Sequence, residues 1–195
     1  MVKLGLTGGI ATGKSLVSGY FQDENIVVLD ADAIYKNLLK TNKVLYNEIK
    51  KSFNLKEVDF KALGKIVFSD ESQLKKLNKI THPYVIKVFS DQLKRLENRE
   101  KIVVLDIPLL YEAKMENFCD KIICVYTDYE TQISRLQTRN NLTKEEAKKR
   151  IDSQESLSEK CKKSDYVIDN SFDIETTFKQ FQKIFKEIKE IANVS

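Results

Sequence analysis

A glycine-rich segment near the start of the chain carries the strongest chemical signal. Residues 8–15 read Gly-Gly-Ile-Ala-Thr-Gly-Lys-Ser, which matches the phosphate-binding pattern GxxxxGK[ST]. Glycine lets backbone N–H groups turn inward and approach phosphate oxygens closely, and the helix expected to follow adds its favourable dipole. We therefore predict a polyphosphate-binding loop formed by Gly9, Ile10, Ala11, Thr12, Gly13, Lys14, Ser15 and Leu16.

Two residues of this segment and one distant aspartate predict a magnesium site. In such loops the lysine reaches the β- and γ-phosphates and the hydroxyl residue helps ligate Mg²⁺, which assigns these roles to Lys14 and Ser15. Asp106 follows the apolar run 102–105, so it would lie at the carboxyl end of a buried strand, where ligands of open α/β sheets bind. Asp106 either holds the metal, directly or through water, or caps the next turn.

A pair of aspartates and the only histidine are candidates for binding a hydroxyl substrate. Asp30 and Asp32 end the second apolar run, and one of them could accept the proton of a hydroxyl nucleophile while the other shapes the turn. The alternative is that each caps the following helix. His82 precedes Pro83, and it either positions a substrate or makes a structural hydrogen bond.

Arginines and glutamines recur at helical spacing in the second half of the chain. Gln132, Arg135 and Arg139 are separated by three and four residues, and Arg150 and Gln154 by four, so each set shares one helix face. Solvated helices often carry such charges. Beside a triphosphate, however, arginines can stabilise the charge that spreads over the equatorial oxygens during phosphoryl transfer.

The composition is that of a soluble protein with local basic sites. The 195 residues have a net charge of +4 with 32% charged residues of both signs, which calls for neither nucleic acid nor membrane. No apolar stretch approaches the ~18 residues of a membrane span. The cysteines form no CxxC pair, so a disulfide framework or zinc site is not expected. We expect a cytoplasmic protein, and a monomer, with an oligomer left open.

Five short apolar runs alternate with longer helical patterns. The runs are mostly continuous, which indicates strands buried on both faces of a parallel sheet that helices cover. About 70 residues separate the second run from the third, far more than an ordinary crossover needs. This length predicts a helical subdomain, and a second helical excursion covers 128–163. The runs are 2–6, 26–29, 102–105, 122–126 and 166–168.

Local signals predict where several helices begin and end. A helical stripe through 34–49 is interrupted near Thr41-Asn42, and Asp59 can cap a short helix through Phe68. Pro83 suits the first turn of a new helix. Two capping-box patterns follow, at 143–146 and 156–159.

Taken together, these motifs resemble the dephospho-CoA kinases, a family of P-loop kinases. The loop alone is unspecific, whereas its combination with the other pieces is highly specific and covers most of the chain. The pieces occur in the order of the family. They are Gly5 to Ile10 with Gly13-Lys14-Ser15, Asp30-Ala31-Asp32, Thr81-His82-Pro83, Asp106 to Glu112, Gln132 with Arg135 and Arg139, Arg150 with Gln154, and Asp165 to Asn170.

The resemblance implies a single domain, 1–195, with an α/β fold. Its parallel five-stranded sheet would be flanked by helices in three layers, with a helical insert and a lid. The expected core is 1–31, 100–127 and 164–195, the substrate-binding insert is 32–99, and the lid segment is 128–163. The implied reaction transfers the γ-phosphoryl group of ATP, with Mg²⁺, to the ribose 3′-hydroxyl of 3′-dephospho-CoA, the last step of coenzyme A biosynthesis.

The same resemblance implies roles for individual residues. Lys14 would clamp the phosphates, Asp32 would act as the base or orient the hydroxyl, and Arg139 would stabilise charge from the lid. Residues 9–16 would bind ATP, and Ser15 and Asp106 would hold the metal. The residues that bind the acceptor would be Thr7, Asp32, His82, Leu110 and Arg135.

Some positions depart from the family's usual pattern. Ala11-Thr12 stands for Gly-Ser, and Leu16 for Thr, changes that keep the amides facing the anion and the Ser15 hydroxyl. Tyr111 replaces Phe. Asn140-Asn141 follows Arg139 where Arg-Asp is common, so two charges common in the family's lid are absent at these positions.

Two other functions fit parts of the pattern. A kinase of the same fold could use another acceptor, such as a nucleoside monophosphate or a small metabolite. A nucleotide-gated binding module would instead use bound ATP to control a partner, and only the long helical insert favours it. The acceptor therefore depends on the resemblance and not on the residues alone.

Overall fold

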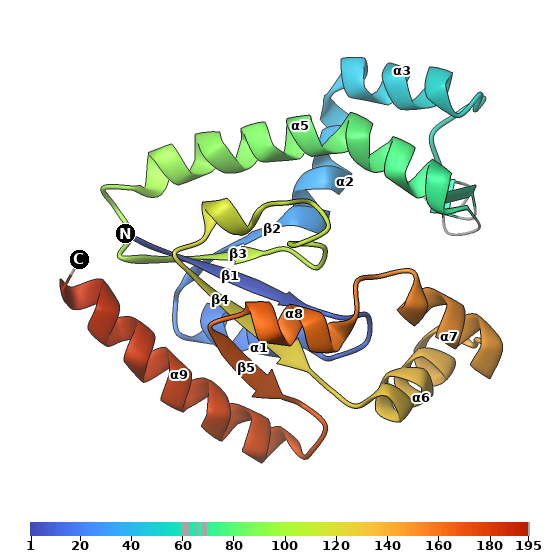
Figure 1. Ribbon diagram of the computed structural model, residues 1–195. Helices are drawn as coiled ribbons and strands as arrows, with labels where there is room; N and C mark the ends of the chain where they lie inside the picture. Colours follow the sequence, from blue (N-terminus) through green and yellow to red (C-terminus); the bar gives the residue numbers. More distant parts are fainter. Residues whose placement is uncertain (60–62, 65, 68–69, 195) are drawn as a thin grey trace. The chain divides into compact units, whose positions relative to one another are not determined.

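The computed structural model describes residues 1–59, 63–64, 66–67 and 70–194 (Figure 1). The chain forms two compact units, Met1–Leu29 with Glu97–Ser195, and Asp30–Leu96. Each unit is described by itself. Within the described ranges, no helix combines the length and the apolar character needed to cross a membrane.

The first unit is built on a five-stranded sheet with the strand order β2-β3-β1-β4-β5. β1 pairs in parallel with β3 on one side and β4 on the other, and β4 pairs in parallel with β5. The predicted five-stranded parallel sheet is therefore confirmed. The strands are β1 Val2–Gly8, β2 Val27–Asp30, β3 Ile102–Asp106, β4 Lys121–Tyr126 and β5 Tyr166–Asp169.

One face of the sheet packs against α1 (Lys14–Asp23) and α9 (Ile174–Val194). Alternate residues of a strand face the same side, and Leu4 and Leu6 of β1 join the core cluster that contains both helices. Phe21 of α1 meets Phe181 of α9 edge to face, with ring centroids 4.9 Å apart. These contacts form the apolar layer on this side of the sheet.

The opposite face carries α8 (Leu157–Lys163). Cys124 of β4 points to this face, where its Sγ lies 3.0 Å from the Sγ of Cys161 in α8. The sheet thus lies between two helical layers (Figure 1), which confirms the three-layer architecture. All three cysteines, each within the described residues, are free thiols, as the sequence predicts.

The second unit is helical in its described parts. It contains α2 (Ala31–Thr41), α3 (Lys43–Ser52) and α5 (Glu71–Leu96). The interruption predicted near Thr41-Asn42 is confirmed, because the side chain of Asn42 accepts hydrogen bonds from Val44 and Leu45 and so caps α3. The helix predicted from Asp59 through Phe68 falls partly outside the described residues.

Helix α5 differs from the prediction at Pro83. The sequence predicts a new helix beginning there, but Pro83 lies inside one helix of 26 residues. Proline removes one backbone hydrogen bond and crowds the preceding turn. A continuous buried stripe at four-residue spacing runs past it and accounts for the uninterrupted helix, because packing outweighs a local break. The stripe is Leu77, Thr81, Val85, Phe89 and Leu93.

Two helices and a short turn complete the first unit. They are α6 (Tyr129–Asn140), α7 (Lys144–Asp152) and the 3₁₀ turn η1 (Glu116–Phe118). The capping box predicted at 143–146 is confirmed before α7. The capping box predicted at 156–159 is wrong, since Ser156 makes no side-chain cap bond and its hydroxyl pairs with that of Ser158 at 2.9 Å.

We predict that the aromatic contact between α1 and α9 stabilises the first unit. Phe21→Ala should lower the free energy of unfolding by about 3–5 kcal/mol, because it opens a cavity in a close-packed layer. Urea denaturation followed by circular dichroism measures this loss. Phe172→Ala is the matched control, since Phe172 is 65% exposed, and it should change stability little. Equal losses in the two variants would contradict the packing role of Phe21.

Candidate active site

The predicted phosphate loop lies between the carboxyl end of β1 and the first residue of α1. Ala11 and Gly13 have positive φ values of 61° and 89°, so the chain reverses sharply before Lys14 begins the helix. A Cβ on Gly13 would lie 2.0 Å from Nδ2 of Asn170. Glycine is therefore required at this position both by conformation and by space.

Side chains from distant elements hold the loop by its carbonyl groups. Asn170, which follows β5, donates from Nδ2 to the Thr12 carbonyl at 2.7 Å. The guanidinium of Arg135 in α6 donates to the carbonyls of Ala11 and Thr12 at 3.4 and 3.3 Å, and to that of Asn170 at 2.9 Å. The carbonyls of Ala11 and Thr12 are therefore bonded by side chains from outside the loop.

Two glutamines hold the same loop at Ile10. Nε2 of Gln132 in α6 donates to the Ile10 carbonyl at 2.7 Å. The amide of Ile10 donates to Oε1 of Gln154, just after α7, at 2.8 Å. The sequence places Gln132 and Gln154 in the family pattern, and the structure gives them this common partner.

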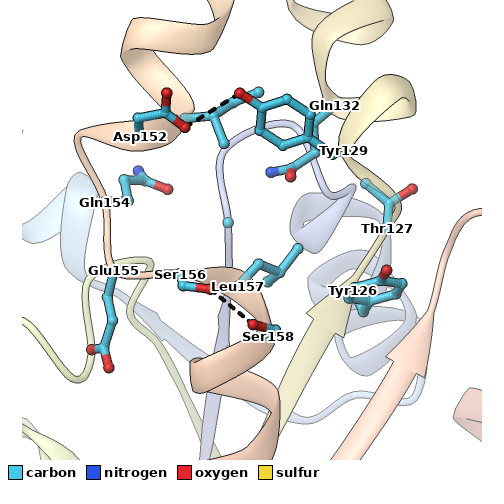
Figure 2. A pocket seen from close by; sticks show the side chains of 12 residues that line it. Tyr126, Thr127, Tyr129, Gln132, Asp152, Gln154, Glu155, Ser156, Leu157 and Ser158 are labelled. Carbon is cyan, nitrogen blue, oxygen red and sulfur yellow. Dashed lines mark hydrogen bonds between the residues drawn. The ribbon is translucent and has the colours of Figure 1, made fainter.

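A pocket of about 420 Å³ borders these glutamines (Figure 2). Figure 2 shows it between α6, the end of α7 and the start of α8, with Tyr129 bonded to Asp152 at 3.3 Å along one edge. Gly9 of the phosphate loop also lines it. The pocket therefore adjoins the loop on the side from which Gln132 and Gln154 reach it.

Lys14 and Asp106 form an ion pair beside the loop. In the register of β1 with β3, Asp106 lies opposite Leu6, so the carboxylate stands at the strand end nearest the loop. The side chains of Lys14 and Asp106 are 15% and 5% exposed, and Ser15 is exposed. The Asp106 side chain therefore points toward the residue expected to clamp phosphate.

The donor set fits Mg²⁺. A serine hydroxyl and a carboxylate are hard oxygen ligands, and Mg²⁺ keeps several waters and takes few protein ligands beside phosphate oxygens. Among the described residues, no group of three or more His, Cys, Asp and Glu could form a denser metal site. Ser15 and Asp106 therefore supply oxygen donors of the kind that Mg²⁺ takes.

Three other predicted residues lie in different surroundings. Arg139 is exposed on α6, and its Nε donates to Oδ1 of Asn140 at 3.0 Å. Thr7 is buried and donates its hydroxyl to the Pro108 carbonyl at 3.1 Å. Leu110 is fully buried and packs near Gly5, so its side chain can shape a substrate site but offers a ligand no exposed surface.

The remaining candidates belong to the second unit. Oδ1 of Asp30 accepts hydrogen bonds from the amides of Asp32 and Ala33 at 2.8 and 3.1 Å, which confirms the capping alternative for Asp30. Asp32 itself is exposed in the first turn of α2. Burial lowers the pKa of His82 in α5, which favours the neutral imidazole at physiological pH.

The strand order and the glycine loop between β1 and α1 define the P-loop kinase class. Solved structures of this class share the fold. Shikimate kinase from Bacteroides thetaiotaomicron matches with a TM-score of 0.52 over 96% of this chain and 98% of its own, at 14% identity. Such low identity shows the fold alone.

A narrower relationship follows from sequence. The family model described as dephospho-CoA kinase matches residues 2–176. The dephospho-CoA kinase of Bacillus licheniformis is 43% identical over 188 residues, covering 93% of this chain and 94% of the relative. The chain belongs to the dephospho-CoA kinase family.

Relatives from distant organisms agree with this assignment. The dephospho-CoA kinase of Arabidopsis thaliana is 39% identical over 95% of this chain and 83% of its own length. The structure of dephospho-CoA kinase from Campylobacter jejuni matches with a TM-score of 0.72 at 31% identity, covering 96% and 97% of the two chains. Family and fold therefore agree along nearly the whole chain.

We predict that Gly13→Ala abolishes tight nucleotide binding. The added Cβ meets the Asn170 amide, and alanine is strained at a positive φ, so ATP affinity should fall by at least about tenfold. Isothermal titration calorimetry with ATP and Mg²⁺ measures the loss.

The matched control is Gly19→Ala in α1, where no heavy atom of the described residues lies within 4 Å of the added Cβ. This variant should bind ATP normally and gain about 0.5–1 kcal/mol of stability from its helix position. If the two variants bind ATP equally well, the geometry assigned to the loop is wrong.

Proposed function

We propose that this protein transfers the γ-phosphoryl group of ATP to the ribose 3′-hydroxyl of 3′-dephospho-CoA, giving CoA and ADP in the last step of coenzyme A biosynthesis. The observation that carries the proposal is the phosphate loop, held by Gln132, Arg135 and Asn170, in a chain whose residues 2–176 match the dephospho-CoA kinase model. We further propose that the protein acts in the cytoplasm as a monomer and that ATP is used with Mg²⁺.

The loop residues Gly9 to Leu16 bind the triphosphate of ATP. The amides at the start of α1 take the phosphate oxygens, whereas those of Ile10 and Thr12 stay bonded to Gln154 and Gly9. Lys14, now paired with Asp106, turns its ammonium to the β- and γ-phosphates. The Ser15 hydroxyl and the Asp106 carboxylate hold Mg²⁺, which neutralises charge on the phosphates when it is bound.

Asp32 orients the acceptor hydroxyl and receives its proton as the oxygen attacks the γ-phosphorus. The bond from the γ-phosphorus to the bridging oxygen breaks, and ADP leaves. His82 hydrogen-bonds the acceptor through an imidazole kept neutral by burial. Arg135, Thr7 and Leu110 support the acceptor site. Thr7 does so through the hydrogen bond of its hydroxyl to the Pro108 carbonyl, and Leu110 through its packing near Gly5.

Arg139 acts after the lid segment, residues 128–163, closes over the bound nucleotide. Its side chain is exposed at the end of α6, so it can turn toward the transferring group without leaving a buried partner. There it stabilises charge on the equatorial oxygens. Closure also excludes water, which would otherwise compete with the acceptor hydroxyl.

A direct assay tests the function. The purified protein is incubated with ATP, Mg²⁺ and 3′-dephospho-CoA, and mass spectrometry follows CoA while a coupled assay follows ADP. We expect the two products in equal amounts, and EDTA should stop both. Adenosine monophosphate and shikimate serve as alternative acceptors. ADP release that is stimulated by either of them and not by 3′-dephospho-CoA would refute the proposal.

We predict that Lys14→Ala lowers turnover by about a hundredfold or more, because it removes charge from the transferring phosphates. Initial rates at saturating ATP measure the effect. The substitution also leaves the nearly buried Asp106 without its cation, so circular dichroism must first establish that the variant is folded. Lys3→Ala is the control, since its exposed ion pair with Asp120 contributes little. Near-normal turnover of Lys14→Ala would exclude the phosphate clamp.

We predict that Asp32→Asn affects chemistry and not ATP binding. An amide keeps the size of the side chain but cannot accept the hydroxyl proton, so kcat should fall by about 10²–10⁴-fold while the dissociation constant of ATP stays close to that of the wild type. Rapid-quench kinetics and calorimetry measure the two quantities. A parallel loss of both would show that Asp32 serves binding instead.

A further inference from the structure

Lys160 is a charged side chain with no solvent exposure. It lies in α8 and its side chain is 0% exposed, a state that lysine adopts almost only when it is paired. Its Nζ donates to Oε1 of Glu112 at 2.7 Å and to the Pro108 carbonyl at 3.2 Å. Both partners lie in the loop that follows β3, so one ammonium group fixes two points of that loop.

Glu112 connects the same ammonium to the segment between α7 and α8. Its Oε1 also accepts a hydrogen bond from the amide of Glu155 at 3.1 Å. The preceding residue, Gln154, accepts the hydrogen bond of the Ile10 amide. Figure 2 shows Gln154 and Glu155 next to each other on this segment. Residues 153–156 between α7 and α8, called the hinge below, are thus bonded to the phosphate loop on one side and to Glu112 on the other.

The Pro108 carbonyl closes this set of contacts into a ring. It accepts the hydroxyl of Thr7 at 3.1 Å as well as the ammonium of Lys160. Thr7 lies in β1, three residues before Ile10. The ring therefore begins and ends on the two sides of the first glycines of the phosphate loop. Its members in order are Thr7, Pro108, Lys160, Glu112, Glu155, Gln154 and Ile10.

A buried ion pair is a costly way to gain stability. Removing an ammonium and a carboxylate from water costs free energy that their attraction often does not recover, and apolar side chains of similar size can be as stable. An apolar side chain, however, cannot donate to the Pro108 carbonyl and to Glu112 together. What Lys160 provides beyond stability is therefore that it fixes the positions of these two acceptors relative to each other.

We propose that Lys160 is a positioning residue for phosphoryl transfer. It contacts neither ATP nor acceptor; it fixes the loop 107–112 and the hinge 153–156 relative to the first amides of the phosphate loop, so that the lid segment closes in a productive register. The role rests on the proposed function. A displacement of about 1 Å at a reacting centre can lower the rate by a hundredfold, so a fixed hinge matters more for turnover than for ATP binding.

Two variants separate positioning from stability. Lys160→Met keeps an unbranched stem of the length of the lysine stem and removes the ammonium, which leaves the Glu112 carboxylate without its cation, so both the melting temperature and kcat should fall. The double variant Lys160→Met with Glu112→Gln removes both charges and keeps an oxygen for the Glu155 amide. Its melting temperature should recover, whereas kcat should remain lowered by about tenfold to a hundredfold, because Pro108 still lacks the lysine donor.

The control is Lys162→Met, two residues further along α8. Lys162 is exposed and forms an ion pair with its neighbour Glu159 on the same helix, so its loss should change neither quantity. Recovery of kcat together with melting temperature in the double variant would overturn the proposal and leave Lys160 a structural role alone.

A second measurement does not depend on the acceptor. Hydrogen exchange of the wild type should show that ATP with Mg²⁺ protects residues 153–156, and this protection should be lost in both Lys160 variants but not in Lys162→Met. Equal protection in all proteins would refute the positioning role. If the wild type gives this protection but does not phosphorylate 3′-dephospho-CoA, the proposed function fails while the role of Lys160 in the hinge stands.

Discussion

The candidate site depends on one constraint: the carbonyl groups of a glycine loop this tight need hydrogen-bond partners, and side chains from other elements supply several of them. In a loop this tight the backbone has few partners of its own, and unbonded buried carbonyls are costly. The Thr12 carbonyl is bonded by Asn170 and Arg135, and the Ile10 carbonyl by Gln132. The phosphate loop is therefore shaped by side chains that never need to touch phosphate.

This constraint explains why the site is assembled from several strand ends. β1 lies at the centre of the sheet between β3 and β4, so its carboxyl end is flanked by the residues that follow both neighbours. Asp106 ends β3, and Gln132 lies in the helix after β4. The parallel arrangement brings these ends to one edge of the sheet, and side chains that follow them can then reach the loop.

The sequence predicts the parts of this site that depend on local pattern. The glycine loop and the apolar runs are each recognised from a few consecutive residues, and the five-stranded sheet follows from the order of the runs along the chain. The helix start predicted at Pro83 is wrong because a buried stripe along α5 outweighs a local break. Asn170 and Lys160 carry no local signal for their roles. The bond from Asn170 to Thr12 spans 158 residues, and only the folded topology brings each of these side chains to its partners.

Two ion pairs beside the loop differ in a way that separates their roles. Lys14 pairs with Asp106 and Lys160 with Glu112, so each lysine takes a carboxylate at or after the end of β3. The Lys14 side chain is 15% exposed, and that of Lys160 is 0% exposed. An ammonium with access to solvent can turn from its carboxylate to a polyphosphate, because water and ligand can reach it. A fully enclosed one cannot, since on leaving Glu112 it would remain as an unpaired buried charge. The first lysine is thus suited to meet the nucleotide and the second to hold the frame that surrounds it.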